Sequence, residues 1–150
     1  MKVVVISGYF NPLHVGHLDY IENAKKLGDY LIVIINSDSQ VKIKGSAPFM
    51  KEEERKRIVS AIKSVDETII SIDKDASVVQ TLRSLWDRYS IDPFFDSMIF
   101  ANGGDRKEGF VPEVELCENL GIVPKYGIGG EKVESSSNLI NIHVSKIRGV

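Results

Sequence analysis

The chain has 150 residues, a length that fits one domain with a buried core. Its formal net charge of -2 argues against a general nucleic-acid-binding protein, which usually carries a clearly basic balance. The single cysteine, Cys117, excludes a disulfide within the chain and suits a reducing cytoplasm, and no apolar stretch approaches the length of a membrane span. We therefore expect one cytoplasmic domain over residues 1–150 that binds neither nucleic acid nor membranes.

Short runs of β-branched residues alternate with helical patterns along the chain. Residues 3–6 are apolar throughout, as expected of a strand covered on both faces, and the apolar spacing becomes helical from residue 15. In the first half we expect a strand at 3–6, a helix from 15 that stops at Gly28, a strand at 31–35, a helix at 51–65 and a strand at 68–72. There follow a helix at 78–89, a strand at 98–101, a helix from Pro112 closed by Gly121, and a short strand from 122.

This alternation predicts an α/β fold, Rossmann-like and doubly wound, with a parallel five-stranded sheet and helices on both faces. Residues 135–147 fit either a strand or a capped helix, and their structure stays open. In such sheets, ligands bind beyond the carboxyl ends of the strands, where the strand order reverses.

The junction after the first strand carries the strongest chemical pattern. Gly8 is expected to let the chain leave the strand in a conformation that most residues resist. His14 and His17 lie side by side at the start of the helix, and Gly16 between them lets a ligand pack on the backbone. The amino terminus of a helix attracts anions, and two imidazoles can donate hydrogen bonds to a phosphate. The pattern predicts a cradle for a triphosphate whose α-phosphate charge is stabilised during transfer.

The two histidines also fit a structural or a metal-binding role. Either one could be a helix cap or a satisfied core residue, and the pair could bind zinc. Two of the three histidines in the chain converge after a glycine turn at this junction, which favours the cradle. A zinc site would need a third ligand nearby, so we expect no metal ligands from the protein.

Three cationic side chains are further candidates for phosphate contacts. A charge at Arg55 is costly unless it meets an anion or a partner, because the helix at 51–65 has an inward stripe formed by Ile58, Val59, Ile62 and Val65. The alternative is a surface arginine whose stem covers the core. Lys42 and Lys44 are expected in a flexible loop with Gly45, where solvated lysines are usual.

Two later segments fit nucleotide binding. Gly103 and Gly104 permit close approach of a flat base, and Asp105 could read its edge; a simple turn is the competing interpretation. Residues Ser135, Ser136 and Ser137 could offer hydroxyls and backbone N–H groups to phosphates.

The segment His14-Val15-Gly16-His17 matches the HxGH signature of the cytidylyltransferase-like superfamily, and residues 8–13 resemble its usual lead-in. The resemblance extends to the bacterial glycerol-3-phosphate cytidylyltransferases, and equally to the nucleotidyltransferase domain of sugar- and heptose-phosphate enzymes. Its further matches are Asn36-Ser37-Asp38, Lys44-Gly45, Glu54-Arg55, Val65-Asp66, Gly103-Gly104-Asp105 and Ser135-Ser136-Ser137.

This resemblance implies a nucleotidyltransferase that moves a nucleoside monophosphate from CTP or ATP to a small phosphorylated polyol or sugar and releases pyrophosphate. CMP is favoured over AMP, Mg²⁺ accompanies the nucleotide, and a homodimer is expected. The catalytic residues implied are His14, His17, Lys44 and Arg55. The implied nucleotide contacts are Gly8, Tyr9, Phe10, Asn11, Gly16, Gly103, Gly104, Asp105, Ser135, Ser136 and Ser137.

The chain departs from the glycerol-phosphate enzymes at two places, which leaves the acceptor open. They carry an arginine where this chain has Gly130, with Lys132 as the nearest substitute, and the insertion at 73–96 is longer. The alternatives are a catalytically silent nucleotide-binding regulatory module and an adenylyltransferase of dinucleotide cofactor synthesis. Cys117 and Trp86 are expected in the core without a catalytic role, and His143 fits several roles.

Overall fold

The computed structural model of the chain describes residues 1–103 and 112–129. Its centre is a five-stranded sheet in the order β3-β2-β1-β4-β5, and every neighbouring pair of strands is parallel. The strands are β1 (Lys2–Gly8), β2 (Tyr30–Ile35), β3 (Glu67–Ile70), β4 (Ser97–Ala101) and β5 (Val123–Lys125). The predicted doubly wound parallel sheet is confirmed.

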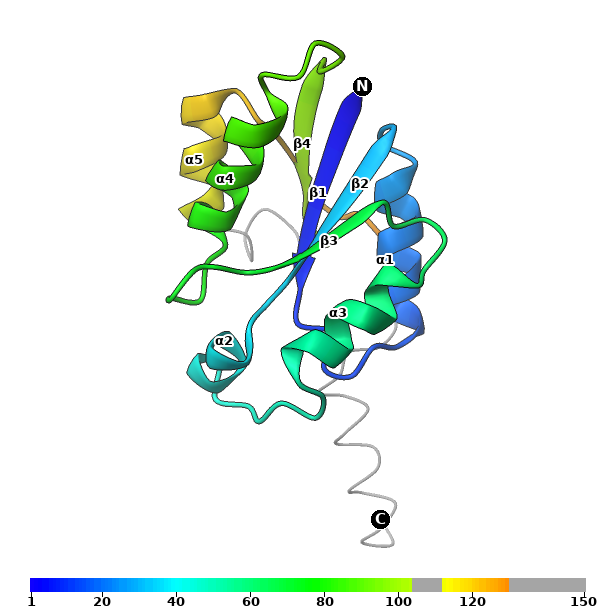
Figure 1. Cartoon of the computed structure of the whole chain (residues 1–150), viewed down its shortest axis with the longest axis vertical. Coiled ribbons are helices and arrows are strands. Elements are labelled where there is room, and N and C mark those ends of the chain that lie inside the picture. The colour runs from blue at the N-terminus through cyan, green and yellow to red at the C-terminus, as the bar shows by residue number, and fades with distance from the viewer. Residues whose placement is uncertain (104–111, 130–150) are drawn as a thin grey trace, which may run out of the picture.

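Helices cover both faces of this sheet (Figure 1). They are α1 (Val15–Lys25), α2 (Asp38–Ile43), α3 (Glu52–Ser60), α4 (Val79–Tyr89) and α5 (Pro112–Leu120). One layer contains α4 and α5, and the opposite layer contains α1 and α3. Cys117 is buried in the core on the side of α4 and α5, and Trp86 packs against that core, as the sequence predicted.

Alternate residues of the central strands face the two helical layers, because side chains along a strand point to opposite faces in turn. Val3 and Val5 of β1 pack with α4 and α5, whereas Val4 and Ile6 pack with α1 and α3. All four side chains are fully buried. Each such burial contributes about 1.5–3 kcal/mol, so the apolar run stabilises β1 between the two helical layers.

The structure contains a short helix, α2, where the sequence predicted only a loop. Ser37 caps its amino end: the Ser37 hydroxyl accepts the N–H of Gln40, and the Gln40 side chain accepts the N–H of Ser37. Lys42 therefore lies in the last turn of the helix, and Lys44 is its carboxyl-terminal cap. A serine followed three residues later by glutamine is a capping-box signature, so the signal was present in the sequence.

The helix expected at 51–65 is shorter than predicted. α3 ends at Ser60, and the turns that follow have hydrogen bonds from an N–H to the carbonyl three residues earlier. Arg55 and Val59 are its buried residues and lie one helical turn apart. Ile58 is 40% exposed, so its expected place on the inward stripe is wrong. Beyond the helix, Ile62 and Val65 still pack against the core.

The third strand also differs from the prediction at its end. We expected it at 68–72, whereas β3 ends at Ile70 and Ile72 is 59% exposed. Strand β1 extends the predicted run by three residues, and β2 and β4 extend theirs by one residue each. The open question at 135–147 lies outside the described residues.

Candidate active site

The order of the strands reverses at β1. From β1 the chain proceeds to β2 and β3 on one side, and later forms β4 and β5 on the opposite side. Because all pairs are parallel, the carboxyl ends of β1, β2 and β4 lie at one edge of the sheet. The segments 9–14, 36–38 and 102–103 therefore meet at the place where doubly wound sheets bind ligands.

The turn after β1 is shaped by close contact between Gly8 and Phe10. A Cβ atom on Gly8 would lie 2.7 Å from Cζ of Phe10, so the ring occupies the space that a side chain would need. The expected unusual conformation belongs to Phe10, at φ 50°, and not to Gly8. The Phe10 side chain is 1% exposed and contacts the His17 ring edge-on at 5.0 Å between centroids. Phe10 therefore supports the histidine ring, and its expected contact with a nucleotide stays a prediction.

His14 and His17 form a reciprocal cap at the amino end of α1. His14 Nδ1 accepts the N–H of Gly16 at 3.1 Å, and His17 Nδ1 accepts the N–H of His14 at 3.1 Å. The two rings stack with centroids 3.8 Å apart. A neutral imidazole whose Nδ1 accepts a hydrogen bond carries its proton on Nε2. The capping arrangement thus gives each ring a defined Nε2–H donor at a helix terminus that already favours anions.

Asn11 connects this turn to the segment that follows α2. Its Nδ2 donates to the carbonyl of Ala47 at 3.0 Å, and its Oδ1 accepts the N–H of Phe49 at 2.7 Å. The Asn11 side chain is buried. In the structure it holds residues 47–50 beside the β1–α1 turn, and its expected contact with the nucleotide stays a prediction.

Arg55 is fully buried and joins three segments. Its Nη1 donates to the carbonyls of Tyr9 at 2.7 Å and Asn36 at 2.6 Å, and its Nε donates to Met50 at 3.0 Å. Its Nη2 forms an ion pair with Asp38 at 2.7 Å. The sequence predicted that Arg55 needs an anion or a partner, and here Asp38 and three carbonyls fill that need. We therefore propose a positioning role for Arg55 in place of direct contact with a phosphate.

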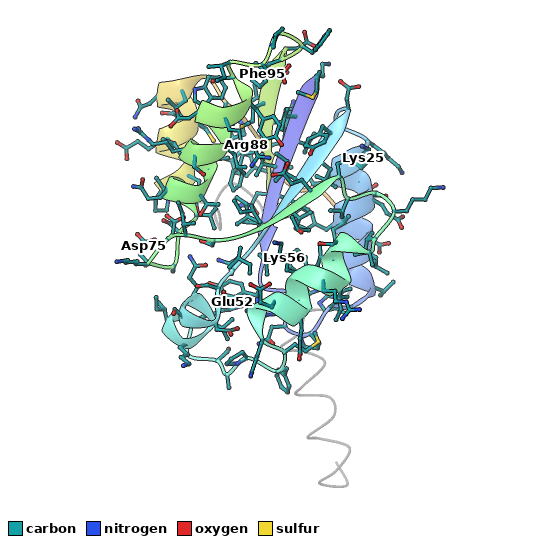
Figure 2. The ribbon with its side chains drawn as sticks, viewed as in Figure 1. Lys25, Glu52, Lys56, Asp75, Arg88 and Phe95 are labelled. Carbon is teal, nitrogen blue, oxygen red and sulfur yellow. The ribbon has the colours of Figure 1, made fainter. Side chains whose placement is uncertain are left out.

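Two further side chains bind the segment 36–38, which Arg55 also binds, and were not singled out from the sequence. Glu52, at the start of α3, accepts the backbone N–H of Asp38 at 2.9 Å and so links α3 to α2 (Figure 2). Gln40 is fully buried and donates to the carbonyls of Asp75 and Ser77, both at 2.8 Å. For Gln40 the capping box with Ser37 was visible in the sequence, whereas no sequence pattern indicated the role of Glu52.

Lys44 and Tyr9 meet beside the turn. The Lys44 ammonium lies 4.4 Å from the centroid of the Tyr9 ring, a cation–π contact. Burial raises the pKa of Tyr9, and the charge of Glu113 raises it further. The phenol therefore stays protonated at neutral pH and can donate a hydrogen bond, while Lys44 brings a positive charge to the same edge as the histidines.

Glu113 is a buried carboxylate near this edge that was not singled out from the sequence. Its Oε1 accepts the N–H of Val78 at 2.8 Å and so connects the amino ends of α4 and α5. Within the described ranges, its Oε2 is the buried side-chain oxygen that finds no hydrogen-bond partner. Burial, followed by the charges of Glu113 and Glu118, raises the pKa of the Cys117 thiol to about 11, so that thiol is no nucleophile at neutral pH.

The edge near β4 is described only in part. Gly103 lies against Tyr20 and Ile128, and a Cβ there would make contacts no closer than 3.5 Å. Tyr20 anchors α1 to the end of β4 by donating to the carbonyl of Ala101 at 2.7 Å. The remaining predicted contacts of this edge lie outside the described residues: Gly104, Asp105, Ser135, Ser136 and Ser137, together with Gly130, Lys132 and His143.

A hollow of about 590 Å³ lies after β3, lined by Ile72, Asp73, Lys74, Asp75 and Gln80. Figure 2 shows Asp75 at the outer corner of the loop between β3 and α4. The Asp73 carboxylate accepts the N–H groups of Gln80 and Thr81 at 2.8 and 2.9 Å, so it caps α4. Because the Asp73 carboxylate serves that helix and the Asp75 carboxylate accepts the N–H and hydroxyl of Ser77, we place the chemistry at the histidines and not in this hollow.

Comparisons with known proteins show the family of the chain. A family model described as cytidylyltransferase-like matches residues 5–150. A FAD synthase from Ferroglobus placidus is 49% identical over 135 residues, covering 83% of this chain and 88% of its own. The bifunctional protein HldE from Citrobacter koseri is 39% identical over 113 residues, which cover 69% of this chain and 24% of HldE.

A similar solved structure is the lipopolysaccharide core biosynthesis protein from Thermoplasma volcanium. It has a TM-score of 0.61 and 27% sequence identity, and the match covers 84% of this chain and 93% of that chain. No helix within residues 1–103 and 112–129 is long and apolar enough to cross a membrane.

Proposed function

Because the chain belongs to the cytidylyltransferase-like family and is a nucleotidyltransferase, we propose that it transfers AMP from ATP to the phosphate of flavin mononucleotide (FMN), forming FAD. The observation that carries this proposal is the 49% identity with a FAD synthase over 88% of that protein's length. FAD is AMP joined to FMN through a pyrophosphate linkage, so making it from these parts is an adenylyl transfer to a phosphomonoester. The identity supports the adenylyltransferase alternative over the expected preference for CTP.

In the proposed reaction an oxygen of the FMN phosphate attacks the α-phosphorus of ATP. The new oxygen–phosphorus bond forms as the bond to the bridging oxygen breaks, and that electron pair leaves with pyrophosphate. A phosphomonoester has a second pKa of about 6 and is largely ionised near neutrality, so no general base is required. Catalysis then depends on alignment and on neutralising charge at the α-phosphate.

His14 and His17 fit that role through their Nε2–H donors at the amino end of α1. We assign His17 to the developing charge at the α-phosphate and His14 to the bridging region. Lys44 supplies a positive charge that can leave the Tyr9 ring for a phosphate. Gly16, between the histidines, lets the phosphate approach the backbone.

Mg²⁺ fits this scheme as an ion bound to the triphosphate. Residues 1–103 and 112–129 contain no cluster of three or more His, Cys, Asp or Glu side chains that could hold a metal. The ion, arriving with ATP, would supply charge neutralisation at the phosphates. The expected homodimer also remains a proposal, which light scattering during gel filtration would test.

The test is Mg²⁺-dependent pyrophosphate release with ATP, CTP, GTP and UTP against FMN, glycerol 3-phosphate and heptose 1-phosphate. His14→Asn and His17→Asn are the matched variants, because asparagine can accept the same backbone N–H as the histidine Nδ1. We expect release with ATP and FMN, and a loss of about 10²–10³ in kcat for His17→Asn without loss of fold. Wild-type turnover in His17→Asn would overturn its assignment, and release only with CTP would overturn the choice of nucleotide.

A further inference from the structure

The segment that follows α2, residues 44–51, is held beside the histidine turn by hydrogen bonds; we call it the Lys44 loop. Asn11 binds it at Ala47 and Phe49, and Arg55 binds the Met50 carbonyl at 3.0 Å. These bonds fix the backbone on both sides of the Phe49 side chain. Phe49 is nevertheless 65% exposed, so its ring adds little to the core.

Tyr9 lies next to this loop. One guanidinium, that of Arg55, donates both to the Tyr9 carbonyl at 2.7 Å and to the Met50 carbonyl at 3.0 Å, so the two backbones are adjacent. The Tyr9 ring carries the Lys44 ammonium above its face. The Tyr9 ring and the Lys44 ammonium are thus in contact, and the backbone that carries Phe49 lies next to the Tyr9 backbone.

Exposed apolar side chains also occur in the segments that follow this edge of the sheet. Among the described residues eight large hydrophobic side chains are exposed, and four of them follow the carboxyl ends of β1, β2 or β3: Val15, Ile43, Phe49 and Ile72. Pockets for small molecules combine apolar and aromatic walls with a few polar groups. A sugar or polyol phosphate offers this surface only hydroxyl groups, which would lose hydration without gaining partners.

We propose that Phe49, with Tyr9, contacts the flat ring system of the acceptor and makes this site selective for aromatic phosphomonoesters over sugar and polyol phosphates. The inference rests on the proposed function, since it names the acceptor-recognising residues of the same site. The ring of the acceptor stacks on Phe49, and its phosphate lies toward Lys44 and His14. Asn11 and Arg55 hold the Phe49 backbone in place and are positioning residues.

The experiment measures KM and kcat for FAD formation in Phe49→Ala and Phe49→Tyr, together with direct FMN binding followed by flavin fluorescence in the absence of ATP. Loss of one aromatic–ring stacking contact raises KM or Kd for FMN by about 10- to 100-fold. We expect this rise in Phe49→Ala, with kcat and the KM for ATP close to wild type and with recovery in Phe49→Tyr. Phe94→Ala is the matched control, because Phe94 is 78% exposed and lies beside Met1 at the opposite edge.

The outcomes separate this inference from the proposed function. Wild-type FAD formation with an unchanged KM for FMN in Phe49→Ala would overturn the inference and leave the function standing. A wild-type protein that neither binds FMN nor forms FAD would overturn both. A change from dimer to monomer in Phe49→Ala with unchanged KM would show that the ring covers a second copy of the chain, which also refutes the inference.

Discussion

Replacing Arg55 with alanine tests whether this residue acts through the fold or directly on substrate. The side chain makes three hydrogen bonds to backbone carbonyls and one ion pair to Asp38, all between 2.6 and 3.0 Å. Each buried polar group left without a partner costs about 1–3 kcal/mol. The Asp38 side chain is 28% exposed and is hydrated once Arg55 is removed, so the loss of the ion pair adds little to the destabilisation. We expect Arg55→Ala to lower the free energy of unfolding by about 3 kcal/mol or more, because three backbone carbonyls lose their donor.

Urea unfolding followed by circular dichroism measures this change, and Trp86 fluorescence gives a second probe. Arg57→Ala is the control, because Arg57 is exposed on the same helix and should change stability by no more than about 0.5 kcal/mol. A double-mutant cycle with Asp38→Asn isolates the ion pair. Wild-type stability in Arg55→Ala, combined with loss of pyrophosphate release, would refute the positioning role and restore a direct contact with phosphate.

Three smaller changes test further parts of the structure. Gly8→Ala places a Cβ at 2.7 Å from the Phe10 ring and should cost about 1–3 kcal/mol; an unchanged melting temperature would contradict that packing. Burial raises the pKa of the Cys117 thiol to about 11, above the ordinary thiol pKa of about 8.5. The unfolded chain therefore ionises first, and the stability that the buried thiol contributes below a pH of about 8.5 is lost as pH rises toward 11. Cys117→Ala should remove this fall in unfolding free energy at alkaline pH, and a profile of stability against pH identical to wild type would refute the effect. Glu113→Ala leaves the Val78 N–H without its acceptor and should cost about 1–3 kcal/mol, whereas Glu113→Gln keeps an acceptor; equal losses in urea unfolding would argue against this bond.

The sequence was sufficient for the sheet because its strands are continuous apolar runs. Successive residues such as Val3 and Val4 are buried on opposite faces of the parallel sheet, and no helical spacing competes with that interpretation. The errors fall where short-range signals decide the structure. α2 has six residues and depends on the Ser37–Gln40 capping box, a signal that the prediction of a loop left out. α3 is shorter than predicted because, after Ser60, hydrogen bonds to the carbonyl three residues earlier replace the α-helical bonds to the carbonyl four residues earlier.

The sequence indicated the histidine turn, but it did not indicate the contacts that Arg55 and Asn11 make in the fold. A helix start with two imidazoles indicates an anion site from sequence alone. The partners of Arg55 and Asn11 come from segments 5 to 46 positions away, and sequence spacing holds no record of such contacts. The family resemblance implied that both touch the nucleotide or its phosphates; for Asn11 this stays a prediction, and for Arg55 we propose a positioning role instead. In the structure, both are buried and hold the loops that form the site.

The most direct test of the proposed reaction is a competition in one vessel. The protein receives equal ATP and CTP with FMN, glycerol 3-phosphate, heptose 1-phosphate and Mg²⁺, and the products are identified by mass spectrometry. We predict FAD as the dominant new dinucleotide, formed together with pyrophosphate and lost in His17→Asn. A cytidine-containing product without FAD, or FAD formation that persists in His17→Asn, would contradict the proposed reaction.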